Sequence, residues 1–253
     1  MQHDQFSNTT PAPGRRAGVL LWLGLYALAM ALVEAAIVVH LRHLYYPLDP
    51  HEVFPLALLN DADLALELAR ELATVVMMVA VAVLAESGWA RRFAAFVFVF
   101  GVWDLGYYGW LKLWLDWPRH WLEWDVLLLI PWPWFGPWLA AALIAALFTL
   151  WGGWILTDAR ALRPRRADVA GFVAGTLVAL TAFLAPAWPL LAGGEPAFRD
   201  WQPGTFLWAV YWPGLGAMAV ALWSAARHRQ RRRAIDPGIR AARSAGMKFF
   251  DAG

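Results

Sequence analysis

The chain has 253 residues, of which 60% are hydrophobic and 16% are charged, and its formal net charge is +2. Soluble domains carry about 25% charged residues, so this composition argues against a soluble domain and predicts an all-α integral membrane protein. Cysteine is absent, which excludes disulfides, thiolate metal sites and cysteine nucleophiles.

The N-terminal region contains the first predicted spanning helix. Residues 1–14 are polar, and we expect them to form a disordered cytoplasmic tail. Arg15 and Arg16 then precede an apolar run from Ala17 to Val39. A cleaved signal peptide has an apolar core of about 7–15 residues, whereas this run is long enough to cross a bilayer. We therefore expect a retained helix.

Five further spanning helices are predicted by apolar runs at about 62–84, 93–113, 137–156, 169–191 and 204–226. The connection 40–61 is rich in proline, tyrosine and histidine, and we expect an ordered cap on the membrane surface. Gly171 and Gly175 have the GxxxG spacing that permits close helix contact. The predicted domain organisation is one six-helix unit from 15 to 226 and a basic cytoplasmic tail from 227 to 253.

The arginines predict the orientation. With a cytoplasmic N-terminus, most of them fall in cytoplasmic segments, as the positive-inside rule requires. These are Arg15, Arg16, Arg91, Arg92, Arg160, Arg163, Arg165, Arg166 and the arginines of the tail. The outer segments hold only a few basic residues, Arg42, Lys112, Arg119 and Arg199. We therefore expect a protein of the bacterial inner membrane with both termini in the cytoplasm.

A tryptophan-rich segment separates the third and fourth predicted helices. Half of the 18 tryptophans lie between Trp103 and Trp138. Tryptophan favours the membrane interface, because its ring is apolar and its N–H needs a partner. Pro131, Pro133 and Pro137 prevent a continuous helix here. The sequence therefore predicts an interfacial or re-entrant segment, which is tolerated at depth only where it packs on protein or lines a cavity.

Acidic residues gather in the outer ends of the first three predicted helices. Helical rise puts Glu34 about 7 Å, Glu71 about 10 Å and Asp104 about 12 Å below the outer helix ends. A charged side chain in the membrane costs about 2.5–3.5 kcal/mol on insertion scales, so these carboxylates must be paired, protonated or bound to a metal. In the first case Arg70 pairs with Glu34 or Asp104 and the network fixes helix packing.

The second hypothesis is a site for a divalent metal, or for acid–base chemistry, on a lipid-like or quinone-like molecule. Carboxylates and imidazoles are suitable ligands for such a metal. The candidate metal ligands are Glu34, Glu67, Glu71, Asp104, His40 and His43. The candidate catalytic residues are Glu34, Glu71 and Asp104. The candidate ligand-binding residues are Arg70, Tyr107, Tyr108 and Asp125. Without a metal, the same residues would bind a cation or a polar head group, and whether the protein is an enzyme stays open.

Two other roles remain open. The chain is a transporter of protons or cations if the carboxylates form a relay, although the inner halves of the helices offer no matching polar groups. It is an accessory subunit of a membrane complex, or a homo-oligomer, if the GxxxG and tryptophan surfaces contact a partner. We expect contact with membrane lipid and no nucleic-acid partner. Heme is not expected, because no histidine falls in the second to sixth predicted helices.

Four segments also resemble a known family. They are VEAAIVVHLRHLYYP (33–47), ELARELATVVM (67–77), WDLGYYGWLK (103–112) and WDVLLLIPWPWFGP (124–137). In these segments, which fall within the first 140 residues, the chain resembles an uncharacterised family of bacterial polytopic membrane proteins. The resemblance implies a membrane protein and transfers no activity and no catalytic residue.

Overall fold

The computed structural model describes residues 13–130, 132–158 and 162–228. Its elements are α1 (Pro13–Tyr45), α2 (Asp61–Ala85), α3 (Trp89–Leu115), β1 (Trp124–Val126), β2 (Phe135–Pro137), α4 (Trp138–Thr157), α5 (Arg166–Leu184), α6 (Trp188–Arg199) and α7 (Trp208–Arg227). Of the two predicted tails, 1–14 and 227–253, only residues 13, 14, 227 and 228 fall within the described ranges. In the part described, six helical segments are long and apolar enough to cross a membrane. The predicted all-α multi-pass membrane protein is confirmed.

Two helix boundaries differ from the prediction. α1 continues through His40 and His43 to Tyr45, so these histidines lie on the helix and not in the following loop. The fifth predicted helix is divided: α5 ends at Leu184, and the short α6 follows from Trp188. Pro186 explains this break, because proline lacks an N–H and disfavours helical geometry at the residue before it.

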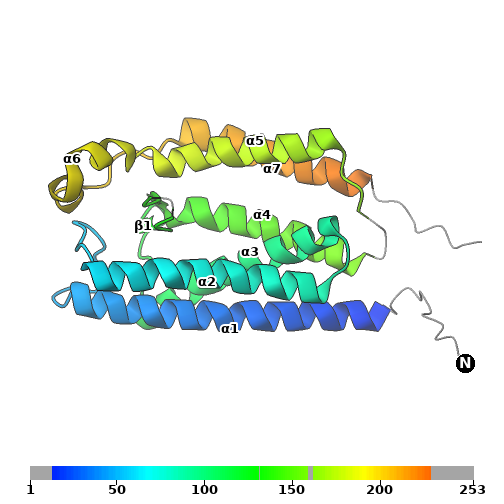
Figure 1. Ribbon diagram of the computed structural model, residues 1–253, viewed down its shortest axis with the longest axis horizontal. Coiled ribbons are helices and arrows are strands. Elements are labelled where there is room, and N and C mark those ends of the chain that lie inside the picture. Colours follow the sequence, from blue (N-terminus) through cyan, green and yellow to red (C-terminus); the bar gives the residue numbers. More distant parts are fainter. Residues whose placement is uncertain (1–12, 131, 159–161, 229–253) are drawn as a thin grey trace, which may run out of the picture.

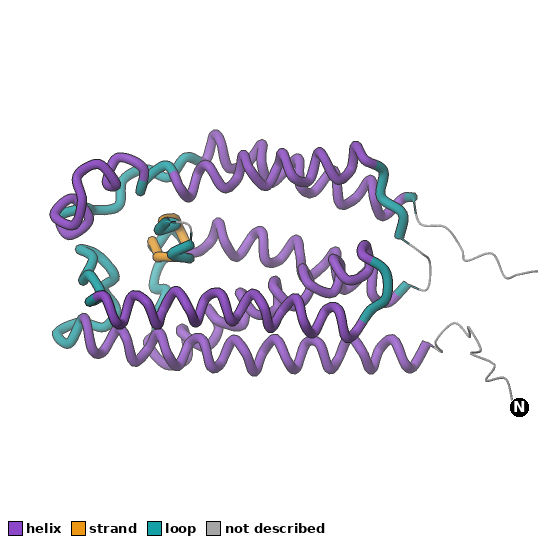
Figure 2. The backbone as a smooth tube through the Cα atoms, in the orientation of Figure 1, coloured by secondary structure: helices purple, strands orange, loops and turns teal. Residues whose placement is uncertain are grey.

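The spanning helices lie side by side and define two ends of the molecule (Figure 1). We call one the hairpin end, because it holds β1 and β2 together with the long connections 46–60 and 185–207. We call the other the short-loop end. It holds the turn 86–88, the start of α1 and the end of α7 (Figure 2).

α3 is the central helix, since it packs against α1, α2 and α4. α5 and α7 pack closely on each other, and glycines make this approach possible. A Cβ on Gly175 would lie 2.8 Å from the carbonyl oxygen of Gly214, and a Cβ on Gly214 would lie 2.5 Å from the amide nitrogen of Ala179. Gly175 of the GxxxG pair therefore serves a contact within the chain.

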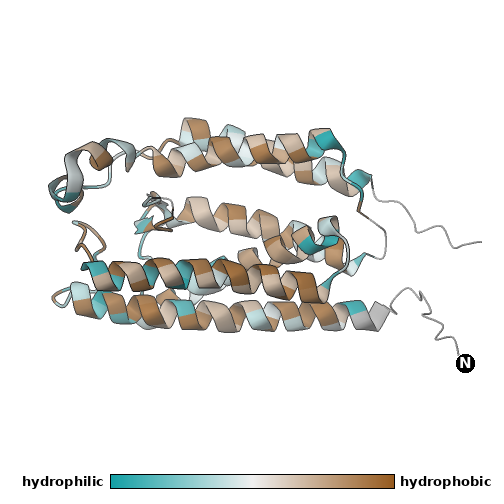
Figure 3. Cartoon of the chain, viewed as in Figure 1, coloured by the Kyte–Doolittle hydropathy of each residue, from teal (hydrophilic) through white to brown (hydrophobic). Residues whose placement is uncertain are grey.

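The outward surfaces of the spanning helices are apolar. Leu66 and Leu84 of α2 are 71% and 85% exposed, and Leu150 of α4 is 74% exposed. Figure 3 shows the apolar colouring along the helices and polar residues mainly toward their ends. This is the surface that a helix bundle surrounded by lipid requires.

The tryptophan-rich segment folds as a two-stranded hairpin. β1 pairs antiparallel with β2, with Asp125 opposite Gly136. A Cβ on Gly136 would lie 2.7 Å from the Phe183 ring, so only glycine permits the strand to approach α5 this closely. The Phe135 ring stacks on Trp201, with ring centroids 4.6 Å apart. The tryptophan-rich segment thus forms aromatic clusters at the hairpin end.

Candidate functional site

The first group of charged residues links α1 to α2. Arg70 pairs with Glu34 of α1 and with Glu67 of its own helix. Its Nε donates to Glu67 Oε2 at 2.9 Å. Buried ion pairs need such multiple contacts, because desolvation opposes the attraction between the charges. The predicted pairing of Arg70 with Glu34 is confirmed, and the group retains an excess of one negative charge when all three side chains are ionised.

Glu71, one residue further along α2, connects that helix to the hairpin. Its side chain is buried, and both carboxylate oxygens accept the backbone N–H of Leu129, at 2.9 and 3.0 Å. Leu129 lies in the loop between β1 and β2. The carboxylate thus satisfies a backbone donor that the hairpin itself does not pair.

A second ion pair lies between α1 and β1. Arg42 Nη2 is 3.3 Å from Asp125 Oδ1, and both side chains are buried. The guanidinium carbon of Arg42 lies 4.0 Å from the centre of the Trp117 ring, a cation–π contact. Burial raises the pKa of Asp125 to about 6, while Arg42 acts in the opposite direction.

This pair is only partly satisfied. Within the residues that the structure describes, Arg42 Nη1, Asp125 Oδ2 and Trp117 Nε1 are buried and have no hydrogen-bond partner. Buried polar atoms are nearly always paired, with protein or with an ordered molecule. The incomplete hydrogen bonding of these three atoms is therefore a cost to the stability of the fold.

Asp104 of α3 has a different environment. The charged groups that act on its carboxylate are those of Asp125 and Glu34, which are both acidic. No donor to its carboxylate is found across the described ranges. Tyr107 and Tyr108 follow on the same helical face, with ring centroids 5.1 Å apart. Asp104 is thus a carboxylate in a spanning helix with acidic groups and aromatic rings around it.

Together these groups have an excess of negative charge. The carboxylates are those of Glu34, Glu67, Glu71, Asp104 and Asp125, and the guanidinium groups are those of Arg42 and Arg70. Two positive charges do not balance five carboxylates. Such an excess of carboxylates is costly wherever water does not reach it.

The histidines are not brought to this site. His40 Nδ1 lies 2.6 Å from the carbonyl oxygen of Ala36, and His43 Nδ1 lies 2.7 Å from that of Val39. Both side chains are exposed on α1. Among the described residues, no three His, Asp or Glu side chains are grouped so that they could hold a metal ion. The structure therefore gives no support to the predicted metal ligands Glu34, Glu67, Glu71, Asp104, His40 and His43.

Sequence reasoning missed Arg42 as a site residue. With a helix ending at Val39, this arginine was expected in an outer segment. The buried face of α1 includes Ala27, Ala31 and Ala35, and continuing this helical pattern by two turns reaches Arg42. Extending the helix past the apolar run would have revealed the residue.

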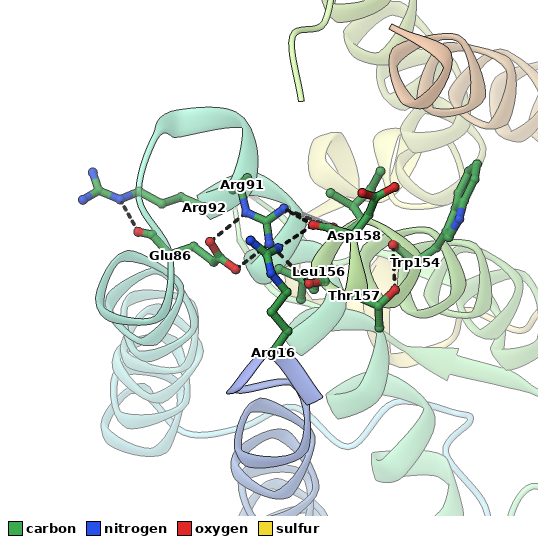
Figure 4. Close-up of polar contacts among 9 residues, drawn as sticks. Arg16, Glu86, Arg91, Arg92, Trp154, Leu156, Thr157 and Asp158 are labelled. Carbon is green, nitrogen blue, oxygen red and sulfur yellow. Dashed lines mark hydrogen bonds and ion pairs between the residues drawn. The ribbon is translucent and has the colours of Figure 1, made fainter. Parts of the chain in front are cut away.

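The short-loop end has its own polar cluster, shown in Figure 4. Arg91 pairs with Glu86 at 2.7 and 2.8 Å and donates to the carbonyl oxygens of Ile155 and Asp158 at 3.2 and 2.9 Å. Arg16 Nη1 also donates to the Asp158 carbonyl, at 2.5 Å. These arginines satisfy the carbonyl groups at the C-terminus of α4, so the role of this cluster is structural.

Comparisons with known proteins give no further assignment: no family model, no curated protein and no solved structure matches the chain. The function is therefore inferred from the fold and from the geometry of the polar site.

Proposed function

We propose that this protein binds a cation, or the cationic head of a lipid-like molecule, at the hairpin end of its bundle. The observation that carries the proposal is the environment of Asp104. Its carboxylate lies in a spanning helix, has acidic neighbours and receives no hydrogen bond from the described residues. A cation bound beside Asp104, which is partly buried, would offset this repulsion.

The aromatic neighbours of Asp104 support a cationic ligand. Tyr107 and Tyr108 lie one helical turn further along α3, and the ring of Tyr108 also contacts Trp117 and Trp138. Faces of aromatic rings attract ammonium groups, with a gain of about 2 kcal/mol where water is excluded. A carboxylate beside such rings is the combination that recognises an alkylammonium group.

The rest of the membrane-spanning region favours binding from one side over transport. No charged residue occurs between Ala17 and Val33 of α1 or between Leu72 and Ala85 of α2. The segment of α3 from Phe93 to Trp103 also lacks charge. A relay of ions to the short-loop end would need polar groups along this path. We therefore propose a binding protein.

The location of the site follows from the proposed orientation. Arginines concentrate at the short-loop end, which the positive-inside rule assigns to the cytoplasm. In a bacterial inner membrane, the hairpin end would then face outward. The site would receive its ligand from the extracytoplasmic side or from the outer leaflet.

Ligand-dependent stabilisation tests this proposal. The purified protein in mild detergent would be melted in increasing choline chloride, potassium chloride or magnesium chloride at constant ionic strength. A ligand that binds only the folded state raises the melting temperature in a saturable way. We expect one of the three cations to do so in the wild type and to fail in Asp104→Asn.

The matched control is Glu195→Gln, which removes an exposed carboxylate that pairs with Arg199 on α6. This variant should respond to the cation as the wild type does. The proposal is wrong if none of the three salts stabilises the folded wild type, or if Asp104→Asn responds with the same midpoint.

A further inference from the structure

An apolar groove runs along the seam between α4 and α7, in the half of the bundle near the short-loop end. Its volume is about 660 Å³. The lining residues are all apolar or tryptophan: Leu147, Leu150, Trp151 and Trp154 from α4, and Ala219, Val220, Leu222 and Trp223 from α7. This groove is separate from the carboxylate site, which lies toward the hairpin end.

The groove exists because α4 and α7 are joined at only a few points. The Tyr211 hydroxyl donates to the Ala140 carbonyl at 2.6 Å, near the starts of both helices. Further along, Trp151 Nε1 donates to the Leu222 carbonyl at 2.8 Å, and both of these side chains are buried. Leu150 and Val220 stand on either side, 74% and 69% exposed. The groove is thus closed at its base, where Trp151 contacts Leu222, and open to the surroundings between Leu150 and Val220.

Two tryptophan rings and one arginine lie at the end of the groove. Trp154 and Trp223 stack across it, with ring centroids 5.5 Å apart. The guanidinium carbon of Arg227, in the last turn of α7, lies 5.3 Å from the centre of the Trp223 ring. Positive charge therefore stands at the level where a bilayer gives way to water, directly beyond an apolar channel.

We infer that this groove binds one phospholipid with an anionic head group. The apolar lining is suited to an acyl chain. A hydrocarbon chain supplies dispersion contacts that the lining residues would lack in an empty groove. The phosphate and the anionic head then meet Arg227, whose planar guanidinium is suited to phosphate oxygens. Basic pockets beside spanning helices select anionic lipids by the same complementarity.

Native mass spectrometry of the full chain tests the inference. The detergent-purified protein would be titrated with phosphatidylglycerol and with phosphatidylcholine that carry identical acyl chains. One arginine near the surface contributes about 1 kcal/mol, so we expect phosphatidylglycerol to bind the wild type about fivefold more tightly. Arg227→Gln should remove this preference while leaving weak binding of both lipids.

A second variant tests the groove itself. Val220→Trp adds a large ring at an exposed position, so the folded core is undisturbed while the channel is filled. It should weaken the binding of both lipids. Arg199→Gln, which removes an exposed arginine at the hairpin end, is the control and should retain the wild-type preference.

Three results would overturn the inference: equal affinities for the two lipids in the wild type, an unchanged preference in Arg227→Gln, or unchanged lipid binding in folded Val220→Trp. None of them bears on the cation site, because the variants used there are different and lie at the opposite end of the bundle.

Discussion

Arg42 and Asp125 are 83 residues apart in the chain, yet they form a buried ion pair through a single 3.3 Å contact. One atom of each side chain, Nη1 and Oδ2, has no hydrogen-bond partner among the residues described. A desolvated pair with incomplete hydrogen bonding contributes little net stability. The pair therefore holds β1 against α1 without being a strong source of stability.

The pH dependence of stability should reveal Asp125. Its pKa is about 6 in the folded protein, above the ordinary value of 3.8, so the folded state binds the proton more tightly than the unfolded state. The resulting stabilisation is complete below pH 3.8 and is lost as the pH rises through 6. Relative to Asp125→Asn, the wild type should lose about 1–3 kcal/mol between pH 4 and 7. Unfolding in detergent at several pH values measures this difference, and parallel profiles for the two proteins would contradict it.

Glu71→Ala should loosen the hairpin loop. The substitution leaves the partly buried N–H of Leu129 without its two carboxylate contacts, at a cost of about 1 kcal/mol. Hydrogen exchange of the peptide that contains Leu129 should accelerate. Glu71→Gln keeps an acceptor oxygen and should lie between the wild type and the alanine variant. Equal exchange in all three proteins would show that the contact does not protect this loop.

Removal of Arg70 should be strongly destabilising. Arg70→Met leaves Glu34 and Glu67 facing each other without a counter-charge. Breaking a fully buried pair in this way costs about 3–5 kcal/mol, and for this partly buried group we expect the lower end of that range. Adding Glu34→Gln should restore part of the loss, because it removes one unpaired carboxylate. A double-mutant cycle measured by thermal unfolding gives the coupling. An additive result would mean that the contact between α1 and α2 carries no stability.

Gly175→Val should separate α5 from α7. Even the first carbon of a side chain would lie 2.8 Å from the Gly214 carbonyl oxygen, so the helices must move apart. Overpacking of this kind costs about 1–3 kcal/mol. Gly171→Ala is the control, because its Cβ would make an ordinary 3.6 Å contact with the Ala221 side chain. Similar melting temperatures for Gly175→Val and the wild type would argue against the close approach.

The sequence was sufficient to predict the spanning helices but not all of their ends. Apolar runs define a span directly, because the bilayer sets its length. The continuation of α1 to Tyr45 passes through polar residues, which a hydropathy pattern does not assign to a helix. The end of α5 at Leu184 depends on Pro186, which favours a break in the helix at this point. The apolar residues after this proline led instead to the prediction of a longer helix.

The sequence predicted a contact of the candidate site only where the two residues are close in sequence or where an unpaired charge in the membrane requires a partner. Arg70 lies three residues from Glu67 on one helix, and the cost of intramembrane charge made a partner such as Glu34 expected. The acceptor role of Glu71 depends on a loop 58 residues away, and that of Asp125 on an arginine 83 residues away. Such contacts follow from the tertiary packing of the hairpin, which no periodicity in the sequence encodes.

α4 and α7 both end at the short-loop end, so the negative poles of two parallel helix dipoles lie on the same side of the bundle. Arg16 and Arg91 bond the final carbonyls of α4, and Arg227 lies in the last turn of α7. The arginines that would direct membrane insertion are therefore also the counter-charges of the finished helices. A protein inserted the opposite way would keep the same contacts between arginines and helix ends, so these contacts do not favour one orientation over the other.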